Sequence, residues 1–185
     1  MPKALSAISI TLRTHDLHWL PSLKPCQDLC AHGRVEFSID GNLLVKPEDG
    51  ILTVSSSAIL LLRTLHKGKE PLPGRGLLFP QSSFNFYKLE CSPYIAIDCD
   101  AHGVDFEIRA GVHEVDIFEK KKDGDLFSVE TDEWKKAVLS FSKEVLDFYE
   151  LGGEKNYGEV CDEHAQNHPL LMQEWKSRHD ELART

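Results

Sequence analysis

Large apolar residues recur at helical spacing late in the chain, and this pattern predicts its longest helix. Between residues 134 and 148 they are separated by steps of four, three, four and three, which places all of them on one side of an α-helix. These residues are Trp134, Val138, Phe141, Val145 and Phe148. We expect Thr131 to cap the helix and Gly152-Gly153 to end it. The pattern therefore predicts a helix over 132–150 that buries one face in a core.

Residues before this helix alternate between apolar and polar side chains, as half-buried strands do. We expect a strand over 3–13 and a hairpin over 34–45 that turns at Asp40-Gly41, a pair favoured in type I′ turns. Prolines interrupt 15–33, which we expect to be irregular. Three serines that can act as N-caps, Ser55 to Ser57, introduce a leucine-rich segment that predicts a short helix over 57–67, buried on several sides.

The remaining elements are short and complete the prediction of an α+β fold. Further strands are expected over 77–79, 84–90, 94–98 and 126–129, after a connector rich in Gly and Pro over 68–76. Near the C-terminus, Pro169 suits the first turn of a last helix. We therefore expect a mostly antiparallel curved sheet packed by two main helices, with a C-terminal helix added to it.

A chain of 185 residues fits one domain with a terminal extension. We place the domain over 1–153, and a linker with a helical appendage over 154–185. No apolar run is long enough to span a bilayer, and the N-terminus lacks the compact apolar block of a secretory signal. We therefore expect a cytoplasmic protein whose five cysteines are reduced.

The negative charge of the chain is concentrated in one segment. The formal net charge is −9, and residues 94–133 hold 12 acidic and 4 basic residues, a net charge of −8. Proteins that bind nucleic acids neutralise phosphates with Lys and Arg, so this balance argues against nucleic acid as a partner, and also against anionic membranes. It favours a protein partner with a basic surface.

A predicted hairpin within this segment separates apolar from acidic side chains. Residues 104–109 and 114–117 alternate, so their apolar residues face a core and their acidic residues face outward. The pattern is most typical of a solvated hairpin face, and a face that binds a cationic partner is the second interpretation. We expect a binding face made of Asp105, Glu107, Glu114 and Asp116, with Asp98 and Asp100 beside it.

Two other functions remain open. The same carboxylates, with His102 or His113, are residue types that act in acid/base or metal-dependent catalysis. The last helix, which carries Trp175, could instead dock the chain onto a larger assembly as an adaptor. His113 is in phase with the apolar residues of the second strand, so we expect it at the edge of the core.

Cys and His residues occur in two clusters whose spacing partly suits zinc. The clusters are Cys26, Cys30 and His32, and Cys161, His164 and His168. A structural zinc site takes four ligands, and neither cluster offers a complete set at recognised spacing. Pro169 also argues against one continuous helix through the second cluster. Calcium-loop, phosphate-loop and nucleophile-elbow motifs are missing from the sequence, so we expect no cofactor.

Three stretches together resemble small bacterial immunity proteins, the cytosolic antidotes encoded beside toxins. They are SAILLLRTL (57–65), IDCDAHGVDFEI (97–108) and WKKAVLSFSKEVLDFYE (134–150). The resemblance covers about residues 35–150 and rests on the pattern of apolar and aromatic positions. It implies an acidic domain, without enzymatic activity, that blocks a toxin by occupying or locking its active site. The family shares no catalytic motif, so the resemblance assigns a role to no individual residue.

Overall fold

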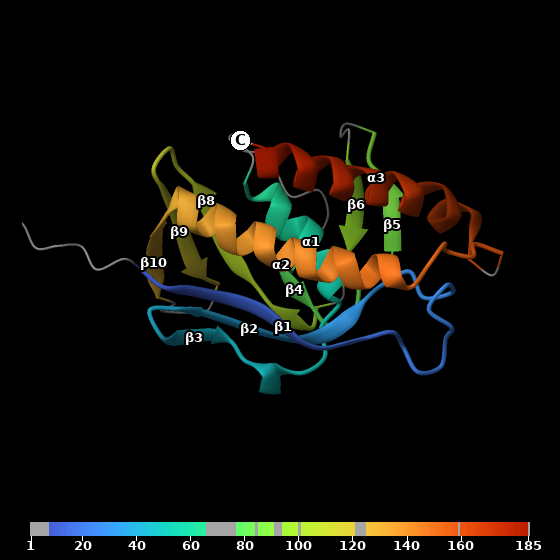
Figure 1. Cartoon of the computed structure of the whole chain (residues 1–185), viewed down its shortest axis with the longest axis horizontal. Helices are drawn as coiled ribbons and strands as arrows, with labels where there is room; N and C mark the ends of the chain where they lie inside the picture. The colour runs from blue at the N-terminus through green and yellow to red at the C-terminus, as the bar shows by residue number, and fades with distance from the viewer. Residues whose placement is uncertain are drawn as a thin grey trace, which may run out of the picture.

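Helices and antiparallel sheets pack around one core, which makes this an α+β protein as expected (Figure 1). The computed structural model describes residues 8–65, 77–83, 85–90, 94–99, 101–120, 125–158 and 160–184. The strands are β1 (Ile10–His18), β2 (His32–Ile39), β3 (Asn42–Val45), β4 (Phe79–Pro80), β5 (Asn85–Lys88), β6 (Ile95–Asp98), β7 (Gly103–Val104), β8 (Phe106–Ala110), β9 (Glu114–Glu119) and β10 (Leu126–Glu130). The helices are η1 (Pro47–Asp49), a 3-10 turn, α1 (Val54–Arg63), α2 (Thr131–Leu151) and α3 (Asp162–Arg184). Within the described segments, no helix is both long and apolar enough to cross a membrane.

The described strands form four antiparallel sheets instead of one continuous curved sheet. Two sheets have three strands, in the orders β1-β2-β3 and β10-β9-β8, and two are the pairs β4-β7 and β5-β6. The turn between β2 and β3 has φ of 49° at Asp40 and 78° at Gly41, which confirms the predicted type I′ turn. A Cβ at Gly103 would lie 2.2 Å from the Phe79 carbonyl oxygen, so only glycine allows β7 to approach β4 this closely.

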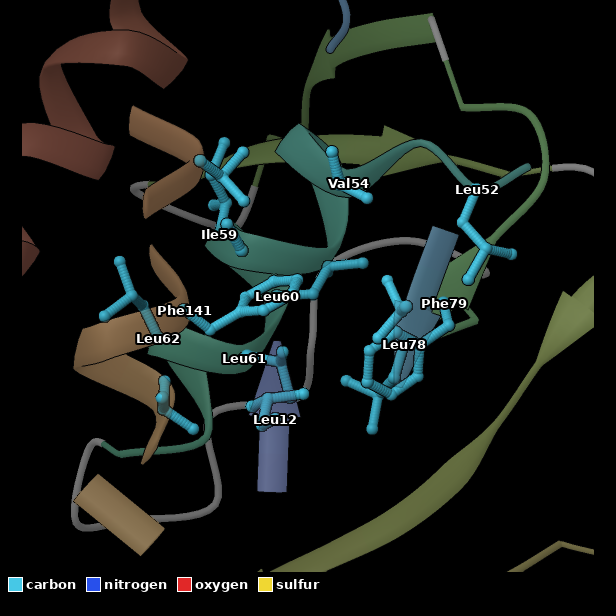
Figure 2. Close-up of a cluster of buried hydrophobic side chains, with 14 of the residues drawn as sticks. Leu12, Leu52, Val54, Ile59, Leu60, Leu61, Leu62, Leu78, Phe79 and Phe141 are labelled. Atoms are coloured by element: carbon cyan, nitrogen blue, oxygen red, sulfur yellow. The ribbon is translucent and has the colours of Figure 1, made fainter. Parts of the chain in front are cut away.

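The short helix α1 lies at the centre of the core. All ten of its residues are buried. Figure 2 shows its leucines among side chains that include Leu12 of β1, Phe79 of β4 and Phe141 of α2. Full burial of each such side chain stabilises the fold by roughly 1.5–3 kcal/mol. Every other layer of the molecule therefore packs, directly or through a neighbour, onto this helix.

The serines at the start of α1 do not cap it, contrary to expectation. The N-cap is Thr53, which makes no side-chain capping hydrogen bond, and the serines lie inside the first turn. The Ser55 hydroxyl accepts a hydrogen bond from the Ala31 N–H at 3.1 Å, and Ser56 donates to the Ser83 carbonyl at 3.3 Å. These hydroxyls tie the helix to the loops beside it.

Strand β1 lies further along the chain than the predicted strand over 3–13. It runs to His18, and β2 begins at His32, so the prediction of irregular structure over 15–33 is wrong for its first four and last two residues. The reason is pairing with β2: His15 lies opposite Arg34, and after a bulge His18 lies opposite His32. Residues 1–7 fall outside the described part of the chain.

Helix α2 follows the predicted apolar stripe and ends before Gly152, as expected. Trp134, Val138, Phe141 and Val145 are buried, and Phe148 is partly buried. The N-cap is Glu130, so the prediction that Thr131 caps the helix is wrong by one residue. Thr131 is instead the first helical residue, and its N–H donates to the His113 carbonyl at 2.9 Å.

Helix α3 runs alongside α2 in the opposite direction (Figure 1). It begins at Asp162, so the prediction that Pro169 lies in its first turn is wrong, and the helix continues through this proline. Trp175 is fully buried and donates from Nε1 to the Ser142 hydroxyl of α2 at 2.9 Å. Leu171 and Trp175 belong to the same core cluster as α1 and α2. The segment expected as an appendage therefore supplies part of the shared core.

Candidate functional site

Three of the predicted binding residues share the outer face of the β8–β9–β10 sheet. Val115 and Ile117 of β9 are buried, and the residues that alternate with them point the other way. We call the outward charged side chains of this sheet the acidic face: Glu107, Arg109, Glu114, Asp116 and Glu130. Glu130 was not among the predicted site residues, yet β10 places it directly opposite Glu114.

The acidic face keeps an excess of negative charge. The Arg109 Nε lies 2.7 Å from a Glu107 carboxylate oxygen, and its guanidinium stacks 4.4 Å from the Phe118 ring centre. Within the described chain, Glu114, Asp116 and Glu130 form no ion pair. Glu114 and Glu130 are like charges in directly opposed positions, an arrangement that destabilises a sheet.

Asp105 does not belong to this face, which differs from the expected alternation. It lies at a break between β7 and β8, and its side chain is only 16% exposed. One carboxylate oxygen accepts from the Phe106 N–H at 3.0 Å and the Leu78 N–H at 3.3 Å. The other lies 2.5 Å from the Lys120 ammonium. Asp105 is thus held in place by neighbours on three sides.

The other predicted residues are dispersed. Asp98 ends β6, opposite Asn85 and in a different sheet, and Asp100 lies outside the described residues. His102 and His113 are both exposed, so the prediction that His113 lies at the core edge is wrong. His113 falls in the turn before β9, where the strand periodicity that suggested its placement no longer applies.

The two candidate zinc clusters are not assembled in the described structure. No group of three or more His, Cys, Asp or Glu residues in those segments lies close enough to hold a metal ion. The Cys30 thiol donates to the Ser83 carbonyl at 3.3 Å, and burial raises the pKa of this thiol. In the second cluster both ring nitrogens of His168 are occupied by tyrosine hydroxyls, at 2.8 Å from Tyr149 and 2.9 Å from Tyr157.

A pocket of about 910 Å³ lies on the outer side of β2, away from the acidic face. His32 and Arg34 of β2 line it, because residues two apart on a strand share one side. Leu20, Leu23 and Ile51 line it with apolar side chains that are 38%, 41% and 46% exposed. We call this cavity the β2 pocket. Its remaining lining residues are Gln27, Asp28, Leu29, Cys30, Gly50, Thr53, Gln81, Ser82, Ser83, Val160 and His164.

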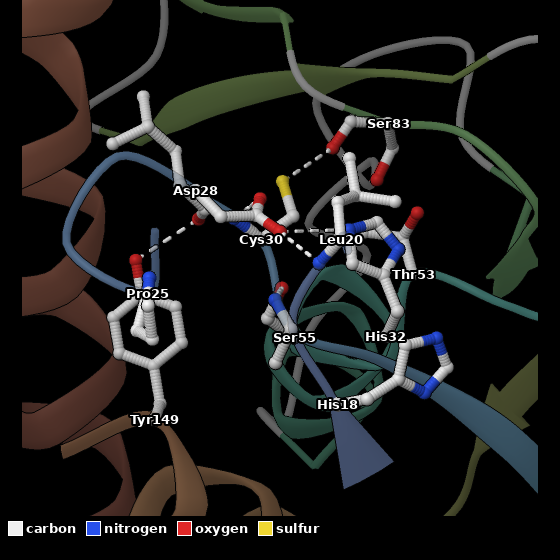
Figure 3. Close-up of polar contacts among 12 residues, drawn as sticks. His18, Leu20, Pro25, Asp28, Cys30, His32, Thr53, Ser55, Ser83 and Tyr149 are labelled. Carbon is white, nitrogen blue, oxygen red and sulfur yellow. Dashed lines mark hydrogen bonds and ion pairs between the residues drawn. The ribbon is translucent and has the colours of Figure 1, made fainter. Parts of the chain in front are cut away.

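A buried Asp–His pair forms one wall of the β2 pocket. Figure 3 shows the Asp28 carboxylate reaching toward the His32 ring, with 3.5 Å between Oδ2 and Nε2. Asp28 also accepts hydrogen bonds from the N–H groups of Leu20 at 2.8 Å and Cys30 at 3.0 Å. Burial alone would raise the pKa of Asp28, but His32 and these two N–H groups outweigh it and lower the pKa. Asp28 is therefore a buried carboxylate that these hydrogen bonds keep ionised within the wall.

Lys155 fastens the loop that carries this wall. Its ammonium donates to the carbonyls of Pro25 at 2.8 Å and Asp28 at 2.7 Å, and lies 3.6 Å from the Trp19 ring centre. Burial lowers the pKa of Lys155 to about 8, against the opposing attraction of Asp28. The 155 position lies far from the loop in the sequence, so no local pattern could indicate this contact.

Comparison with protein-family models, with curated proteins and with solved structures gives no match. Functional proposals for this chain therefore depend on its own geometry and charge distribution.

Proposed function

We propose that this chain is a non-enzymatic binding protein whose acidic face docks onto a basic surface of another protein. The observation that carries the proposal is a set of carboxylates on one exposed sheet face that form no ion pair within the described residues: Glu114, Asp116 and Glu130. Charge of one sign on an exposed surface attracts an oppositely charged partner over long distances and speeds the encounter.

Apolar groups beside these carboxylates suit an interface. Leu126 is 57% exposed and lies opposite Phe118 on the same side of the sheet as Glu107. Val112, in the turn between β8 and β9, is 71% exposed. Protein interfaces combine an apolar centre with a polar rim, so these groups offer contact area to a partner that the charges attract.

The resemblance to immunity proteins leads us to propose a bacterial toxin as the partner and the cytoplasm as the location. The acid/base alternative finds less support in the geometry. Catalytic carboxylates depend on burial or close pairing to separate their pKa values. Here Asp98, Asp105 and Glu107 lie on different strands or loops, and the directly opposed pair Glu114 and Glu130 is exposed to solvent.

The test is protection against the toxin encoded by the neighbouring gene. Bacteria that express the toxin domain should grow when this chain is co-expressed, and should stop growing with the variant Glu107→Lys/Glu114→Lys/Asp116→Lys. The matched control carries the same charge change on exposed positions of α3, Glu163→Lys/Asp180→Lys/Glu181→Lys. Equal protection by both variants would refute the role of the acidic face, and no protection by the native chain would refute the proposed partner.

A further inference from the structure

The β2 pocket has the size and lining of a site for a small molecule. Ligand sites in proteins are mostly apolar cavities of roughly 300–1,000 Å³ with a few fixed polar groups. This pocket has about 910 Å³, and its apolar lining includes Leu20, Leu23, Leu29 and Ile51. Partly exposed leucines and isoleucine gathered around one hollow leave apolar surface in water that a ligand would cover.

The pocket contains a cation that lacks a carboxylate partner. The Arg34 guanidinium donates from Nη1 to the Pro47 carbonyl at 2.8 Å and forms no ion pair within the described residues. Glu36 lies two positions along the same side of β2, but Arg13 at 2.7 Å and His15 at 3.3 Å already occupy it. In a chain with a net charge of −9, a half-buried arginine without a counterion is an available anion-binding group.

Asp28, the one carboxylate among the described residues that line the pocket, does not compete for this role. Asp28 is stabilised by two backbone N–H groups and by His32. Arg34 lies one side-chain row beyond His32 on β2, about 6.6 Å along the strand. The His32 imidazole would therefore lie between Asp28 and an anion bound to Arg34.

Among the described residues, one buried polar atom of the wall has no hydrogen-bond partner: the Ser83 hydroxyl, in a residue that is 2% exposed. Native proteins leave few such groups because each one costs free energy when it is buried unpaired. A ligand with oxygen acceptors near this wall would offer the Ser83 hydroxyl a partner after a rotation about one bond.

We propose that the β2 pocket binds a small amphipathic anion, with its apolar body against Leu20, Leu23 and Ile51 and its carboxylate on the Arg34 guanidinium. The proposal is independent of the acidic face, because the two sites share no residue. A bidentate arginine–carboxylate pair selects for charge and planar geometry, so the head group of the ligand should dominate the selectivity.

The test compares three molecules with the same tail and different head groups: octanoate, octan-1-ol and octylammonium. Each is titrated into the full chain while amide chemical shifts are followed by two-dimensional NMR. Octanoate should bind about tenfold more tightly than the other two, because one charge-assisted pair contributes roughly that factor. The shifts should cluster at residues 20–34, 50–53 and 81–83.

Two variants assign the charge selectivity to the pocket. Arg34→Gln should reduce the affinity for octanoate to that for octan-1-ol, and Ile51→Asp should weaken octanoate binding by placing a negative charge at the exposed rim. The matched control is Arg109→Gln on the acidic face, which should leave octanoate binding unchanged. Equal affinities for the three molecules, tighter binding of octylammonium, no octanoate binding at millimolar concentration, or shifts outside the pocket would each overturn the proposal.

Discussion

The buried residue His168 makes the stability of this protein sensitive to mild acid. It is 1% exposed, its two ring nitrogens contact Tyr149 and Tyr157, and its Nε2 lies 3.2 Å from the Leu29 carbonyl. Burial lowers the pKa of His168 from 6.5 to about 4, an effect that the Leu29 carbonyl partly opposes. In the folded protein the ring therefore stays neutral under conditions where the unfolded chain takes up a proton.

This pKa shift predicts a loss of stability in mild acid. The pKa of His168 is lower in the folded than in the unfolded protein. The contribution of neutral His168 to the free energy of unfolding is therefore fully present above pH 6.5 and is lost as the pH falls toward 4. The full effect amounts to about 3 kcal/mol. The measurement is urea unfolding at about pH 7 and pH 4.5. The free energy of unfolding should fall between these pH values by about 2 kcal/mol less in His168→Gln than in the native chain. His113→Gln, at an exposed position, should keep the native pH dependence; parallel curves for native and His168→Gln would contradict the account.

Which single residues the sequence could identify depended on local pattern. Glu107, Glu114 and Asp116 were found because strand alternation fixes their side, and their placement on one sheet face agrees with it. Arg34 was not singled out from the sequence. Its neighbour on the same side of β2, Glu36, pairs with Arg13 and His15 instead, and this leaves Arg34 available to bind an anion. Such competition between residues of two paired strands is a tertiary property that periodicity does not encode.

At the scale of secondary-structure elements, long periodic segments were predictable and short ones were shifted. The extent of α2 could be predicted because five large apolar residues recur at helical spacing along it. The start of α1 was misplaced, since serines near a helix start can bond to neighbouring loops as readily as to the helix itself. The start of α3 was misplaced because Pro169 is tolerated seven residues after Asp162, inside the helix.

Pro169 therefore destabilises its own helix, which gives a prediction at this scale. It removes the hydrogen bond to the Ala165 carbonyl, and it is exposed, so it adds little packing. Pro169→Ala should raise the free energy of unfolding by about 1–2 kcal/mol, since the gain in the helix exceeds the entropy returned to the unfolded chain. Pro47→Ala is the matched control. Pro47 occupies the first position of η1, where proline is favourable, so its replacement should not raise the free energy of unfolding. A destabilised Pro169→Ala protein would show that α3 is bent to fit its proline.

At the scale of the whole molecule, charge and cavity are separated. The acidic face of the β8–β9–β10 sheet carries an excess of negative charge, whereas the β2 pocket combines apolar groups with Arg34. The α+β class and the location of the negative segment followed from the sequence, because both are sums over many residues. The division into four sheets and the pocket did not, because they depend on which distant segments meet.

The association rate constant with the neighbouring gene's toxin domain, measured against salt concentration, tests the central claim most directly. The native chain should associate rapidly at low salt and more slowly as salt screens the acidic face. Glu107→Lys/Glu114→Lys/Asp116→Lys should associate at least about tenfold more slowly at low salt, and the α3 control with the same net charge should stay within about threefold of the native rate. Association rates that fall equally in the two variants, or in neither, would contradict the account.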